Sequence, residues 1–124
     1  MTINKTPEKI AAQKLRTLGI SAIVMPETSP YNILANGKRM AARILPRQND
    51  GEWQLWTPRD QTSIDIYLLI LTGIPGNEKM PLYLLLEAPV EPKTVRFSFS
   101  TLIRKYGDAV DNWELLTGRK TAAK

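Results

Sequence analysis

The spacing of apolar and polar residues predicts a helix near the start of the chain. Four apolar residues recur at helical intervals and share one face: Ile10, Ala11, Leu15 and Leu18. Thr6 suits the N-cap, Pro7 the first helical position, and Glu8 the positive end of the helix dipole. Gly19 favours a stop after the last apolar residue. We therefore expect a helix over about 7–18.

Apolar runs separated by turn residues then predict strands. SAIVM is typical of a short strand ended by Pro26, and EWQLW predicts another with Trp53 and Leu55 on one face and Gln54 and Trp56 on the other. The run SIDIYLLILTG is almost continuously apolar, as in a central strand covered on both faces, and LYLLLEA repeats that character. A short run, TVRFS, follows.

The dipeptide Asn36-Gly37, between two apolar-rich runs, is the strongest local signal in the chain. Asn-Gly favours a two-residue type I′ turn, because both turn residues take positive φ. The sequence therefore predicts a β-hairpin with strands over about 30–35 and 38–46.

This turn also determines which side chains of the hairpin share a face. Pairing steps outward from Ala35 opposite Lys38, which places Asn32 opposite Ala41. Strand alternation puts one set on one face: Asn32, Leu34, Arg39, Ala41 and Arg43. The other face carries Tyr31, Ile33, Met40, Ala42 and Ile44. This second set is apolar, so we expect it to pack on the core.

Caps and apolar spacing predict helices near the C-terminus. Ser98 or Ser100 suits the N-cap of a helix that Gly107 ends, with Leu102, Ile103 and Tyr106 as its apolar residues. Asp108 or Asp111 suits the start of one or two further turns holding Val110, Trp113 and Leu116. Residues 117–124 are polar and basic and predict a flexible tail.

These elements together predict one α/β domain over residues 1–124, with an N-terminal helix, a central mixed β-sheet of about five strands and C-terminal helices. The chain has neither histidine nor cysteine, which disfavours serine triads, cysteine nucleophiles and zinc hydrolases. The polar start is unlike a signal peptide, and no apolar run approaches the roughly 20 residues of a membrane span. We expect a soluble, cytoplasmic protein without membrane contact.

The helix and the hairpin together carry a family resemblance. The segments EKIAAQKLRTLGI and SPYNILANGKRMAARIL, followed by the strands EWQLW, IDIYLLIL and LYLLL, resemble the PD-(D/E)XK nucleases, which include restriction enzymes and Holliday-junction resolvases. The resemblance implies a restriction-endonuclease-like fold. In an active member, an aspartate and a glutamate of the hairpin bind Mg²⁺, and a lysine positions or activates the attacking water.

The sequence departs from this pattern at all three positions. Asn32 stands at the aspartate position, Ala41 at the glutamate position and Arg43 at the lysine position. Glu8 matches the helix glutamate of resolvase-like members, but one carboxylate alone is a poor magnesium site. The resemblance therefore implies a pseudoenzyme that binds neither metal nor cofactor. On the plainer interpretation, Glu8 only complements the helix dipole, and Asn32 and Arg43 are ordinary sheet residues.

A working enzyme would need carboxylates from elsewhere, such as Asp60 or Asp65, and only then Mg²⁺ as a cofactor. Asp65 interrupts an apolar run and needs a hydrogen-bonding partner if it is buried, so structural pairing is its favoured role. The alternative function is thus a Mg²⁺-dependent DNA endonuclease with a migrated active site.

The net charge of +5 permits a polyanionic partner. Four cations lie on or beside the predicted hairpin and are candidates for binding DNA phosphates: Lys38, Arg39, Arg43 and Arg47. For Arg39 and Arg43, a solvated charged edge that discourages strand aggregation is an equally good explanation. The favoured function is a catalytically inactive DNA-binding or scaffolding subunit of a mobile-element, defence or recombination system, acting as a homodimer or within a larger complex. A protein-interaction module without a nucleic-acid role is the third candidate.

Overall fold

The computed structural model describes residues 6–58, 60–76, 79–90 and 94–117. Its helices are α1 (Pro7–Thr17), α2 (Phe99–Tyr106) and α3 (Glu114–Thr117), with a 3-10 turn, η1, at Gly107–Ala109. Its strands are β1 (Ala22–Val24), β2 (Ile33–Ala35), β3 (Lys38–Pro46), β4 (Trp53–Trp56), β5 (Ile66–Thr72), β6 (Leu82–Glu87) and β7 (Thr94–Phe97). Within these residues, no helix has the length and apolar character needed to cross a membrane.

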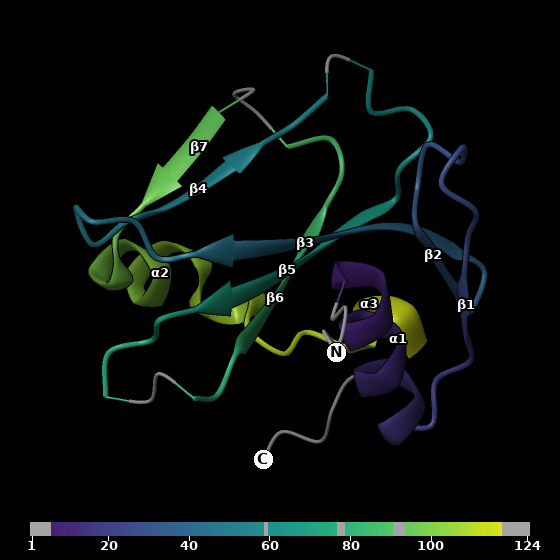
Figure 1. Cartoon of the computed structure of the whole chain (residues 1–124), viewed down its shortest axis with the longest axis horizontal. Coiled ribbons are helices and arrows are strands. Elements are labelled where there is room, and N and C mark those ends of the chain that lie inside the picture. The colour runs from purple at the N-terminus through teal and green to yellow at the C-terminus, as the bar shows by residue number, and fades with distance from the viewer. Residues whose placement is uncertain (1–5, 59, 77–78, 91–93, 118–124) are drawn as a thin grey trace, which may run out of the picture.

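A five-stranded mixed sheet runs through the middle of the molecule in the order β1-β2-β3-β5-β6 (Figure 1). Strands β3 and β5 are parallel, and the other neighbours in this sheet are antiparallel. Helices α1 and α3 pack on one face, and α2 and the β4–β7 ribbon cover the other. The predicted α/β class, with an N-terminal helix, a mixed sheet of five strands and C-terminal helices, is confirmed.

Strand β4, the predicted EWQLW strand, does not belong to this sheet. It pairs with β7 in a separate two-stranded ribbon. Trp53 and Leu55 point from β4 onto the main sheet and are buried, and the indole N–H of Trp53 donates to the carbonyl oxygen of Thr72 at 2.9 Å. The predicted alternation along this strand is correct, since Trp56 on the opposite face is 68% exposed. The packing of Trp53 and Leu55 on the face of the main sheet therefore positions β4, which pairs with β7 and not with a strand of that sheet.

Helix α1 begins and ends as the sequence predicts. The Thr6 hydroxyl accepts a hydrogen bond from the backbone N–H of Lys9, and Gly19 takes a positive φ of 79° just after the helix. The buried residues are Ala11, Ala12 and Leu15. Leu18, predicted on the same face, is 43% exposed, because it is the C-cap residue and lies beyond the last full turn.

The hairpin turn at Asn36-Gly37 is confirmed, with φ values of 50° and 82°. Its register places Ala35 opposite Lys38, as predicted. The first strand, however, begins at Ile33 and not at about residue 30. A turn precedes it, closed by a hydrogen bond from the N–H of Ser29 to the carbonyl of Pro26. Residues 30–32 are not part of the strand, although the backbone N–H of Asn32 still donates to the carbonyl of Met40 at 3.1 Å.

The C-terminal elements follow the predicted caps. Ser98, one of the two predicted candidates, caps α2 by accepting from the N–H of Thr101. Ile103 is 57% exposed and does not join the core, because Leu102 already occupies the inward side of this short helix. Thr117 ends α3 and so is helical, whereas residues 118–124 of the predicted tail lie outside the described residues.

Candidate nucleic-acid interface

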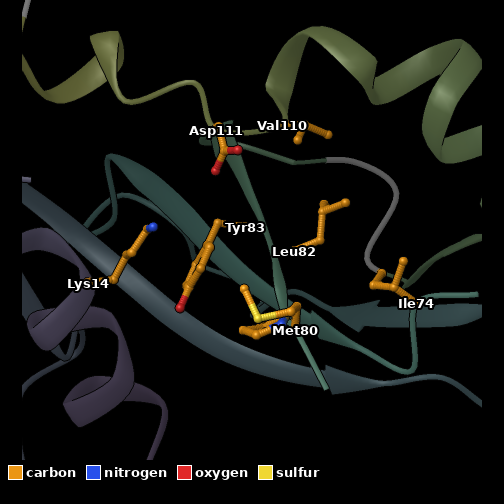
Figure 2. A pocket seen from close by; sticks show the side chains of 8 residues that line it. Lys14, Ile74, Met80, Leu82, Tyr83, Val110 and Asp111 are labelled. Carbon is orange, nitrogen blue, oxygen red and sulfur yellow. The ribbon is translucent and has the colours of Figure 1, made fainter. Parts of the chain in front are cut away.

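Three of the predicted site residues lie beside the part of β3 that β2 leaves unpaired. Strand β2 pairs only with the first three residues of β3, and beyond that pairing a hollow of about 230 Å³ opens. Glu8 of α1, Asn32 and Arg43 all line this hollow. The structure thus brings together three of the four positions that the nuclease resemblance singles out, from three separate segments of the chain. A larger pocket of about 360 Å³ lies elsewhere, between α1 and β6 (Figure 2).

The fourth position, Ala41, does not line the hollow. It is 0% exposed and packs in an apolar cluster with Trp53 and Tyr67. The sequence places Ala41 on the hairpin face opposite the core, and this expectation is wrong because the β4–β7 ribbon and α2 cover that face too. The position that the resemblance assigns to a metal-binding glutamate is therefore surrounded by apolar side chains.

The amide of Asn32 pairs with the backbone of β3. Its Oδ1 accepts from the N–H of Ala42 at 2.8 Å, and its Nδ2 donates to the carbonyl of Ala42 at 3.0 Å. These are the two hydrogen bonds that a neighbouring strand residue would make, so the side chain prolongs the ladder after β2 has ended. An aspartate could make only the first of them, because a carboxylate has no donor.

Arg43 is the cation of the hollow, and two carboxylates accompany it. Its Nη1 donates to the carbonyl of Ala42 at 3.1 Å, and its guanidinium lies among the lining side chains with Glu8 and Glu27. Glu27 was not predicted from the sequence; it stands one residue after the predicted strand terminator Pro26 and before the hairpin. No group of three or more histidine, cysteine, aspartate or glutamate residues in the described part of the chain is arranged to hold a metal ion.

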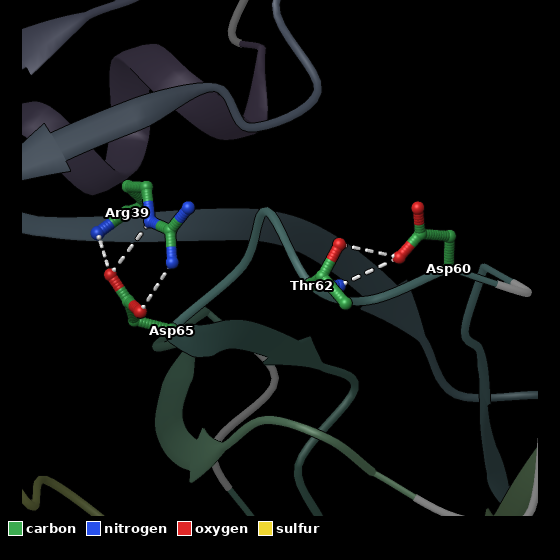
Figure 3. Close-up of polar contacts among 4 residues, drawn as sticks. All are labelled: Arg39, Asp60, Thr62 and Asp65. Atoms are coloured by element: carbon green, nitrogen blue, oxygen red, sulfur yellow. Dashed lines mark hydrogen bonds and ion pairs between the residues drawn. The ribbon is translucent and has the colours of Figure 1, made fainter.

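Arg39 has a structural role. Its Nε and Nη2 bind both oxygens of Asp65 at 3.1 and 2.9 Å, and its backbone N–H donates to the same carboxylate at 2.8 Å (Figure 3). Asp65 in turn donates its own N–H to the carbonyl of Arg39. The structural pairing expected for Asp65 is confirmed, and it anchors the start of β5 against β3.

Asp60, the other candidate carboxylate for a migrated active site, is engaged separately. It accepts hydrogen bonds from the N–H and the hydroxyl of Thr62, at 2.9 and 2.7 Å. These bonds lower the pKa of Asp60. Figure 3 shows the Asp60 and Asp65 carboxylates in two separate hydrogen-bonded pairs, so they are not arranged as one metal site.

Arg47 lies at the far end of β3 and supports the base of the β4–β7 ribbon. Its Nε donates to the carbonyl of Gly51 at 3.1 Å, and its guanidinium lies 5.7 Å from the centre of the Trp53 ring. It stands nine positions after Lys38 in the sequence, a span of about 30 Å along an extended strand. The four predicted cations therefore do not form one compact phosphate site.

Aromatic side chains mostly belong to the core. Trp53 and Tyr67 are fully buried, and Tyr83 is partly buried against Trp113. Burial raises the pKa of Tyr67, and the positive charge of Arg43 partly opposes that shift. The hydroxyl of Tyr67 donates to Gln61 at 2.7 Å. Trp56 of β4 is the exposed exception among these strand aromatics.

The Arg39–Asp65 pair should make stability depend on acid pH. Hydrogen bonds from Arg39 hold the pKa of Asp65 below its usual value, with burial opposing. The pair therefore stabilises the fold fully above the unfolded pKa of about 3.9, and this contribution is lost as the pH falls through the lower folded pKa. We expect Asp65→Asn to cost about 1 kcal/mol at pH ~7, since the pair is partly exposed.

Urea unfolding at neutral pH and below about pH 3 measures this difference. The difference in free energy of unfolding between Asp65→Asn and the parent chain should become smaller at the lower pH. Asp108→Asn, at an exposed position, should have the same free energy of unfolding as the parent chain at both pH values. A difference for Asp65→Asn that stays constant with pH would contradict the role assigned to the carboxylate.

Comparison of the chain with protein-family models, with curated proteins and with solved structures gives no match. The resemblance to PD-(D/E)XK nucleases therefore stays a prediction from the sequence.

Proposed function

We propose that this chain is a catalytically inactive, nuclease-like protein with a restriction-endonuclease-like fold, which binds DNA or scaffolds a larger assembly. Mobile-element, defence or recombination systems in the cytoplasm are the setting that fits such a subunit. The observation that carries the proposal is the state of the hairpin: Ala41 is buried in an apolar cluster, and the amide of Asn32 is paired with the backbone. Both features argue against metal-dependent cleavage at this position.

Lys38 and Arg43 are the hairpin cations best able to meet phosphate. Lys38 is exposed beside the turn, and Arg43 is partly exposed at the free edge of β3. Arg39 and Arg47 are held by Asp65 and Gly51, so we assign them a smaller part. Glu8 and Glu27 repel phosphate from the hollow itself, which favours contact along its rim.

Two phosphate contacts provide weak binding, with a salt slope of only about −1.8 for duplex DNA. A second copy of the chain or another subunit would add contacts and raise the effective affinity. The proposal therefore includes action as a homodimer or as part of a larger complex.

Fluorescence anisotropy with a labelled DNA duplex, across a series of salt concentrations, tests the proposed interface. We expect Lys38→Gln combined with Arg43→Gln to weaken binding at low salt and to reduce the salt slope by about 1.8. Arg104→Gln combined with Lys105→Gln removes the same charge from α2 and serves as the matched control. Equal losses in the two double variants would show that net charge, and not this surface, governs binding.

The same protein samples also distinguish the two alternative functions, an active endonuclease and a protein-interaction module. Cleavage of plasmid or branched DNA that requires Mg²⁺ and that Glu8→Ala abolishes would establish an endonuclease and overturn the proposal. The absence of any DNA binding at low salt would favour a protein-interaction module instead.

A further inference from the structure

A second pocket, between α1 and β6, combines apolar walls with two opposite charges. It measures about 360 Å³, within the range of about 300–1,000 Å³ typical of small-molecule sites. Its apolar lining comes from the loop before β6, from β6 itself and from the segment after η1: Ile74, Met80, Leu82 and Val110. Lys14 of α1 and Asp111 supply the charges.

The structure holds the two charged groups near Tyr83 without joining them. The ammonium of Lys14 lies 5.3 Å from the centre of the Tyr83 ring, and the backbone N–H of Asp111 donates to the carbonyl of Tyr83 at 2.9 Å. Figure 2 shows both charged ends turned toward Tyr83. Among the described residues, the ion pairs are those of Arg39 with Asp65 and of Arg96 with Asp50 and Glu52, so Lys14 and Asp111 do not neutralise each other.

The backbone of Asp111 adopts an uncommon conformation beside the pocket. Its φ of 53° is in the left-handed region, which L-residues adopt at a cost. Asn36 is the other described non-glycine residue with positive φ, and the type I′ turn explains it. At Asp111 this conformation places a carboxylate beside the pocket while hydrogen bonds from its N–H and to its carbonyl hold the backbone.

We infer that this pocket binds a free α-amino acid with an apolar side chain. The ligand carboxylate pairs with Lys14, its ammonium pairs with Asp111, and its side chain lies against Met80 and Leu82. A carboxylic acid without the amine faces repulsion from Asp111, and an amine without the carboxylate faces repulsion from Lys14. A peptide carries its two terminal charges far apart and cannot present both beside one side chain. This site is separate from the proposed DNA surface.

Calorimetric titration of the whole chain with leucine tests the site. We expect saturable binding with a Kd at or below about 1 mM. Isocaproate, which lacks the ammonium, and isoamylamine, which lacks the carboxylate, should each bind at least about tenfold more weakly, because each loses a charge-assisted contact. Glycine, without an apolar side chain, should also bind more weakly.

Two variants test the residues assigned to the charges. Lys14→Met keeps the aliphatic stem, and Asp111→Asn keeps a residue that tolerates the left-handed conformation. Each should weaken leucine binding by about tenfold or more. Lys9→Met on the same helix and Asp108→Asn in η1 are the matched controls and should bind leucine normally.

Three results would overturn the inference: no leucine binding at about 10 mM, ten times the expected Kd; equal binding of leucine and either truncated analogue; or unchanged binding in both pocket variants. DNA binding measured on the same variants should be unaffected, so failure of this inference is distinguishable from failure of the proposed function.

Discussion

Replacing Ala41 with glutamate is expected to destabilise the protein by roughly 3–5 kcal/mol, although it restores the carboxylate of the nuclease pattern. The side chain at this position is fully enclosed by the apolar cluster that includes Trp53 and Tyr67. A glutamate there would be both too large for the space and separated from water without a partner. The added carboxylate should therefore not create a metal site.

Urea unfolding with and without Mg²⁺ measures this effect. Gln54→Glu, at a partly exposed position of β4, controls for a new carboxylate and should cost much less. If Ala41→Glu is stable and Mg²⁺ stabilises it further, the new carboxylate binds the ion. That result would contradict the proposal that the chain has lost its metal site.

Asn32→Asp should destabilise the protein by about 1–3 kcal/mol at neutral pH, because it removes one hydrogen bond and places a carboxylate against the carbonyl of Ala42. The loss should shrink as the pH falls toward about 4, where the new carboxyl group takes up a proton and again has a donor. This pH dependence separates the effect from a simple loss of packing.

The measurement is urea unfolding of Asn32→Asp and of the parent chain at both pH values. Asn112→Asp, a partly exposed position just before α3, controls for the added charge and should differ little from the parent. A loss that is the same at both pH values would contradict the ladder-prolonging role of the Asn32 amide.

Local rules account for much of what the sequence predicts correctly. The cap at Thr6, the stop at Gly19 and the Asn36-Gly37 turn each depend on residues within a few positions of one another. The alternation in β4 and the continuous burial of β5 likewise follow from short patterns. These features need no knowledge of distant segments.

The candidate site was predicted only in part, for a physical reason that Ala41 illustrates. Alternation shows which residues share a face of a strand, but not whether another element covers that face. The β4–β7 ribbon joins strands about 40 residues apart, and its packing buries Ala41. Glu27 entered the hollow unpredicted for a similar reason, since the turn before β2 carries it there.

The sequence by itself therefore determined the α/β class, the positions of the turns and caps, and the absence of histidine and cysteine chemistry. Tertiary structure alone decided that Arg39 pairs with Asp65, that Ala41 is enclosed and that Lys14 and Asp111 face one pocket. Caps and turns depend on short-range sterics and hydrogen bonds. Burial and charge pairing instead depend on which distant segments meet, and that is settled only when the whole chain packs.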